Sequence, residues 1–120
     1  MPRYVTITNI TRDTALAVRC RVAHSLRERI VGLLTTAEVP PGEGLLLERT
    51  SSIHMWFMRY AIDVVFLDRS GRITKTVSRL LPWRVIWWAR GARDCLELRA
   101  GALDGTGTQK GDQLVFEPVP

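Results

Sequence analysis

Three side chains have the residue types of a general base with orienting carboxylates: His54, Asp63 and Glu97. A carboxylate that accepts a hydrogen bond from an imidazole holds that ring in one tautomer and one orientation. Strand alternation brings His54 and Asp63 within reach of one another if residues 52–58 and 61–68 form neighbouring strands. Glu97, on the expected polar face of a later strand, is the third candidate. The alternative is a hydrogen-bonded network that fixes strand register, and we assign no catalytic residue.

A metal site is a second chemical possibility. The soft ligands that could suit copper(I) are spread over distant positions: His54, Met55, Met58, Cys20 and Cys95. Paired ligands such as Cys-x-x-Cys are absent from the sequence, and methionines in an apolar strand are ordinarily packing residues. We therefore expect no metal and no other cofactor.

The most unusual stretch is residues 80–90, which hold three of the four tryptophans. This stretch could fold inward as a lid on one end of a barrel. It could instead be exposed and contact a protein partner or an anionic membrane surface through Trp83, Trp87, Trp88, Arg84 and Arg90. Stacking of single-stranded nucleic acid is the least favoured account, because the neighbouring strands lack interleaved aromatic residues on a polar face.

Two classes of function follow from these residues. The favoured one is a non-enzymatic binding or accessory domain, whose barrel end holds a small ligand or a partner segment through His54, Trp56, Met58, Trp83 and Trp88. The alternative is a small hydrolase or lyase that uses the His54, Asp63 and Glu97 cluster. A bell-shaped pH dependence that is lost on replacing His54 would distinguish the second from the first.

Hydrophobic periodicity indicates the elements that must position these residues. Ser25 and Glu28 form a capping box before a short amphipathic helix, and residues 68–72 form a hairpin turn in which Gly71 supplies a positive φ. Residues 100–111 form a glycine-rich corner. Alternating or continuous apolar runs predict strands over residues 4–9, 16–22, 45–47, 52–58, 61–68, 73–78, 95–99 and 112–117.

These elements predict an α+β, predominantly β fold, a small barrel-like arrangement of about seven or eight short, mostly antiparallel strands with one short helix. The inward-facing positions of the strands should form its core: Leu16, Val18, Ile62, Val64, Phe66, Leu96, Leu98, Leu114 and Phe116.

Length and composition exclude several classes of protein. With 120 residues, 46% of them hydrophobic and 24% charged, the chain is expected to form a single domain over residues 1–120 with an ordinary core. No apolar run is long enough to span a membrane and no signal peptide is recognisable, so we expect a cytoplasmic location. The net charge is +5, and residues 69–93 contain seven cations and no acid.

Five stretches together resemble the domain of unknown function 192 family: residues 29–33, 53–68, 80–83, 96–101 and 110–114. The aromatic-Met block followed by Ile-Asp-x-x-Phe, within residues 53–68, is the most specific of them. The resemblance implies a compact, strand-rich, barrel-like fold in a widespread prokaryotic family, and it implies no reaction. Many relatives carry Trp-Met-Lys-Asn in the central strand and an export signal, whereas this strand runs from His54 to Tyr60.

Overall fold

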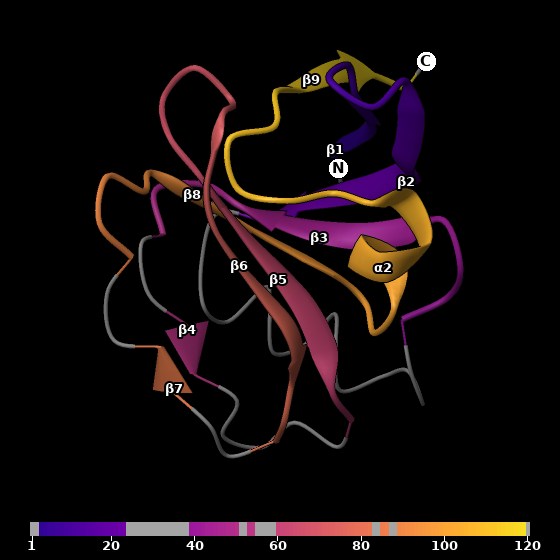
Figure 1. Ribbon diagram of the computed structural model, residues 1–120. Coiled ribbons are helices and arrows are strands. Elements are labelled where there is room, and N and C mark those ends of the chain that lie inside the picture. The colour runs from indigo at the N-terminus through magenta and orange to yellow at the C-terminus, as the bar shows by residue number, and fades with distance from the viewer. Residues whose placement is uncertain are drawn as a thin grey trace.

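The computed structural model describes residues 3–23, 39–50, 60–82 and 89–119, together with the backbone of residues 53–54 and 85–86. Within these residues, seven strands form one strongly curled sheet shaped like half a barrel (Figure 1). Its strands, in spatial order, are β6 (Ile73–Leu80), β5 (Ile62–Leu67), β8 (Asp94–Arg99), β3 (Glu43–Leu47), β2 (Thr14–Ala23), β1 (Arg3–Asn9) and β9 (Leu114–Pro118). The expectation of a predominantly β, barrel-like fold is confirmed.

Strand directions in this sheet are mixed. Every neighbouring pair is antiparallel except β2 and β3, which run parallel from Arg19 opposite Glu43 to Ala23 opposite Leu47. Two further strands, β4 (Ile53–His54) and β7 (Val85–Ile86), pair antiparallel with each other outside this sheet. In Figure 1 they lie below the main sheet, at one side of the molecule.

The sheet carries a core on each face, and β5 contributes to both. All six residues of β5 are buried, with Val65 and Leu67 in a first core and Ile62, Val64 and Phe66 in a second. A strand covered on both faces reads as a continuous apolar run, which is why this segment has so little polar character. The predicted core positions that are buried are Leu16, Ile62, Val64, Phe66, Leu96, Leu98 and Leu114.

The turn between β5 and β6 has the predicted chemistry. Asp68 Oδ1 accepts hydrogen bonds from the backbone N–H groups of Ser70 and Arg72, at 2.9 and 3.0 Å, and from the Ser70 hydroxyl at 2.8 Å. Gly71 has a φ of +84°, and a Cβ there would lie 2.8 Å from the carbonyl oxygen of Leu114. Glycine is therefore required both by the backbone angle and by the close approach of β9.

The prediction that Val18 belongs to the core is wrong, because β2 contains a bulge. The pairing shifts between Val5 opposite Cys20 and Ile7 opposite Ala17, which inserts an extra residue and changes the side-chain phase. The backbone N–H groups of Val18 and Arg19 both donate to the carbonyl oxygen of Gly42, at 2.8 and 3.0 Å. Val18 is consequently 58% exposed.

Three smaller expectations also change. Phe116 is only partly buried and packs against the first core. The predicted corner at residues 100–111 contains a helix, α2 (Ala102–Thr106), whose Leu103 is buried in the first core. β3 begins at Glu43, two residues before the strand expected at residues 45–47. The helix expected from Ser25 onward lies outside the described residues and stays a prediction. No helix in the described part of the chain is long and apolar enough to cross a membrane.

A buried polar cluster closes the seam between β1 and β9. The side-chain amide of Asn9 donates to Asp112 Oδ2 at 3.0 Å and to Thr108 Oγ1 at 3.1 Å. Arg12 Nε forms an ion pair with the same Asp112 oxygen at 3.1 Å. Burial raises the pKa of Asp112, but hydrogen bonds from Asn9, Arg12 and the backbone of Gln109 lower it, and the net pKa lies below its usual value.

Candidate functional site

Asp63 is held by the backbone rather than by another side chain. Its side chain is fully buried on the first-core face of β5. Oδ1 accepts a hydrogen bond from the backbone N–H of Arg79 at 2.8 Å, and Oδ2 accepts two, from Gly101 at 3.1 Å and Leu103 at 2.9 Å. The carboxylate therefore joins β5 to the end of β6 and to the start of α2, as a structural clamp.

Glu97 lies on the other face of the sheet. It stands opposite Val64, a member of the second core, whereas Asp63 stands opposite Leu98, a member of the first. Directly opposed residues of neighbouring strands point to the same face, so Asp63 and Glu97 point away from one another. The interpretation of Glu97 as a residue of a polar strand face is also wrong, because Glu97 is fully buried and so are its neighbours along β8, Leu96 and Leu98.

His54 is not brought to Asp63 by strand pairing. The two sides of β5 are occupied by β6 and β8, so the described part of that stretch, Ile53–His54, does not pair with β5 as the sequence suggested. Instead, His54 pairs with Val85 across the β4–β7 ladder. The side chain of His54 lies outside the described residues, as do Trp56, Met58, Trp83 and Trp88, and also Trp87 and Arg84. Arg90 is described and exposed.

The two cysteines do not provide a nucleophile. Cys20 and Cys95 are both buried and form no disulfide, and they belong to different cores. Burial raises the pKa of the Cys20 thiol to about 12. A backbone hydrogen bond at Leu46 lowers this pKa, and the nearby charge of Glu97 raises it. A thiol with this pKa stays protonated at neutral pH and is inert. Among the described residues, no three His, Cys, Asp or Glu side chains gather to hold a metal.

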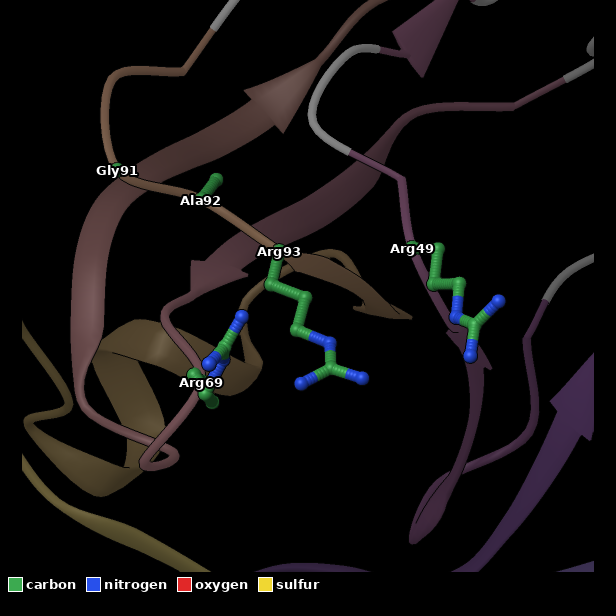
Figure 2. A pocket seen from close by; sticks show the side chains of 5 residues that line it. All are labelled: Arg49, Arg69, Gly91, Ala92 and Arg93. Atoms are coloured by element: carbon green, nitrogen blue, oxygen red, sulfur yellow. The ribbon is translucent and has the colours of Figure 1, made fainter.

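A pocket lined by arginine was not expected from the sequence. It has a volume of about 530 Å³ and is lined by Arg49, Arg69, Gly91, Ala92 and Arg93 (Figure 2). Arg49 follows β3, Arg69 belongs to the β5–β6 turn, and Arg93 directly precedes β8. Figure 2 shows the Arg93 side chain between those of Arg69 and Arg49. Two of the three arginines, Arg69 and Arg93, belong to the cation-rich run of residues 69–93. No feature of that run predicted that Arg49 would join them in a pocket.

Comparison with known proteins places this geometry in an uncharacterised group. The model of the DUF192 family, described as "Uncharacterized ACR", matches residues 7–116. A UPF0127 protein of Thermococcus sibiricus is 32% identical over 116 residues, which cover 91% of this chain and 73% of that protein.

Solved structures share the fold. A candidate transcription regulator from Sinorhizobium meliloti superposes with a TM-score of 0.77 at 22% identity, covering 97% of this chain and 94% of that one. A protein of unknown function from Novosphingobium aromaticivorans also gives a TM-score of 0.77 at 22% identity, covering 93% of this chain and 83% of that one. At this level of identity the likeness shows a common fold alone.

Proposed function

This chain belongs to the DUF192 (UPF0127) family of uncharacterised proteins, and we propose that it is a non-enzymatic binding or accessory domain. Its ligand is a small molecule or a segment of a partner protein, held at the end of the barrel where β4 and β7 meet. The observation that supports this proposal is the β4–β7 ladder, which sets His54 opposite Val85, inside the tryptophan-rich stretch of residues 80–90.

The proposed ligand contacts are the residues that flank this ladder in the sequence. Trp83 stands two residues before Val85, and Trp88 stands two residues after Ile86. Trp56 and Met58 follow His54 at alternate positions. Aromatic rings and a thioether offer large apolar contact areas, and an imidazole adds a polar group that orients a ligand, which is the usual composition of a small-molecule or peptide site.

The geometry gives less support to the alternative, a small hydrolase or lyase. That mechanism needs His54, Asp63 and Glu97 together, whereas Asp63 and Glu97 lie on opposite faces of the sheet. The Asp63 carboxylate is already bound by backbone N–H groups from two other segments. The alternative would be supported by turnover with a bell-shaped pH profile that His54→Ala abolishes while the fold is retained.

Native mass spectrometry of the protein purified gently from its own cells tests the binding function. We expect a bound mass on the wild type that is lost in the Trp83→Ala, Trp88→Ala double variant. Leu81→Ala is the matched control, because Leu81 is an exposed apolar residue of the same stretch, and it should keep the bound mass. Retention of every bound species by the double variant would contradict the proposal, as would a wild type that carries none.

The same stretch supports a second partner, an anionic membrane surface. Its proposed contacts combine indole rings, which favour the interface, with cations that meet lipid phosphates: Trp83, Trp87, Trp88, Arg84 and Arg90. Flotation with vesicles that contain phosphatidylglycerol should recover the wild type and not the tryptophan double variant. Equal recovery of the two proteins, or recovery with neutral vesicles, would contradict membrane contact.

A further inference from the structure

Three separate segments deliver a guanidinium group to one pocket. Arg49 comes from the segment after β3, Arg69 from the β5–β6 turn, and Arg93 from the segment before β8. In Figure 2 the three side chains border a common space, with Gly91 and Ala92 on its remaining side. Gly91 and Ala92 have no long side chain that would fill the space. The pocket is thus largely open to solvent and lined by cations.

The backbone behind each arginine is tied to the rest of the fold. The N–H of Arg49 donates to Asp94 Oδ1 at 2.9 Å, and the N–H of Arg93 donates to the carbonyl of Leu67 at 2.7 Å. The residues on either side of Arg69 are held by the Asp68 turn described above. Because these backbone segments are already fixed, little backbone entropy is lost when a ligand binds.

The described part of the chain gives these arginines no acidic partner. No carboxylate described there forms an ion pair with Arg49, Arg69 or Arg93, although Arg3 pairs with Glu48 and Arg12 with Asp112. Of the acids next to them in sequence, Glu48 pairs with Arg3, and Asp68 and Asp94 each direct a carboxylate oxygen to backbone N–H groups. Three like charges around one space repel each other, and a bound anion would replace that repulsion by attraction.

We propose that this pocket binds the phosphate group of a ligand, through Arg49, Arg69 and Arg93. Guanidinium groups donate paired hydrogen bonds to phosphate, and three of them approaching from different segments suit a tetrahedral group better than a planar carboxylate. A pocket of about 530 Å³ is much larger than one phosphate, so the ligand carries a further part, as in a phosphate monoester or a lipid headgroup. The proposal uses none of the residues of the aromatic site and stands independently of it.

Isothermal titration calorimetry with inorganic phosphate and with pyrophosphate tests the pocket directly. The double variant Arg69→Gln, Arg93→Gln removes two of its cations. Its matched control is Arg79→Gln, Lys110→Gln, which changes two exposed cations outside the pocket lining, with the same loss of charge. Circular dichroism and urea unfolding check that all variants are folded.

We expect the wild type to bind pyrophosphate more weakly as salt rises, because the contacts are exposed and screened. Each lost guanidinium contact should weaken binding about tenfold, and the pair about 100-fold. The control should stay within about threefold of the wild type, because distant exposed charges are worth little.

Sedimentation with vesicles of phosphatidylcholine, with and without phosphatidic acid, distinguishes the two sources of phosphate. Binding to soluble pyrophosphate identifies a free phosphate ligand, and binding only to phosphatidic acid vesicles identifies a lipid headgroup. Either result supports the proposal when the pocket variant loses it and the control does not. Equal losses in both double variants would overturn the proposal, as would a wild type that binds none of these probes.

Discussion

Replacing Asp63 by alanine removes the acceptor of three backbone hydrogen bonds, of which the bond from Leu103 is buried and the other two are partly buried. The three donors belong to the end of β6, to the residue before α2 and to α2 itself, and none of them gains a substitute acceptor from the change. A buried donor left without its acceptor costs about 1–3 kcal/mol. Because removal of a buried carboxylate also relieves its own desolvation cost, we expect the free energy of unfolding to fall by about 3–5 kcal/mol.

Urea unfolding, followed by circular dichroism, measures this loss. A fall of about 4 kcal/mol lowers the midpoint by about 2 M for an m-value of about 2 kcal/mol per molar. Asp63→Asn should lose less, about 1–3 kcal/mol, because its amide oxygen can still face the two donors at the α2 end while its nitrogen meets that of Arg79. Asp104→Ala, on the exposed face of α2, is the control and should change stability by less than about 0.5 kcal/mol.

The order of the three variants is as informative as the magnitudes. If Asp63→Ala unfolds within about 1 kcal/mol of the Asp104→Ala control, the carboxylate is not a structural clamp, since the loss of one buried and two partly buried bonds should cost more than that. Asp63 would then regain its place among candidate catalytic residues.

Three further predictions concern the cores and the seam. Phe66→Ala and Leu98→Ala should each lower the free energy of unfolding by about 2–5 kcal/mol in the same urea assay, because both side chains are fully buried and their removal leaves cavities; a loss below about 1 kcal/mol in either would contradict the assigned core. The Cys20 thiol, with its pKa raised to about 12 by burial, should not react with a thiol reagent at pH 8 until the protein unfolds, and rapid labelling of the folded protein would refute this. Asp112 has a folded pKa below its unfolded value of about 4, so its contribution to stability is complete above that pH and is lost as pH falls through the folded pKa. Wild type should therefore lose stability more steeply than Asp112→Asn below about pH 4, and parallel pH profiles would count against the ion pair with Arg12.

The parts of the fold set by local chemistry could be predicted from the sequence. The apolar run within residues 61–68 and the Asp68 to Gly71 turn defined β5 and its hairpin with β6, because a single carboxylate and a single positive φ specify that turn. The bulge that exposes Val18 has no such local signal, because it depends on how β2 meets both β1 and the loop that precedes β3.

The candidate site was harder to predict because it depends on contacts between distant segments. Strand alternation correctly placed Asp63 on the face of β5 opposite to Ile62 and Val64. Only the register with β8 shows that Glu97 faces the second core. The pairing of His54 with Val85 joins segments that no pattern in the sequence connects. The arginine pocket combines three segments in the same way, and a run of cations cannot reveal which of them converge.

The seam between β1 and β9 has a consequence for how the protein is made. The first strand along the chain, β1, pairs on its outer side with the last strand, β9, with Val5 opposite Pro118 and Asn9 opposite Leu114. The two labelled ends of the chain lie in the same part of the molecule in Figure 1. During synthesis at about 5–20 residues per second, the outer edge of β1 stays unpaired until β9 has left the ribosome. A chain that has not yet released β9 thus carries an open strand edge beside an incomplete core, and such an edge can pair with other extended chains.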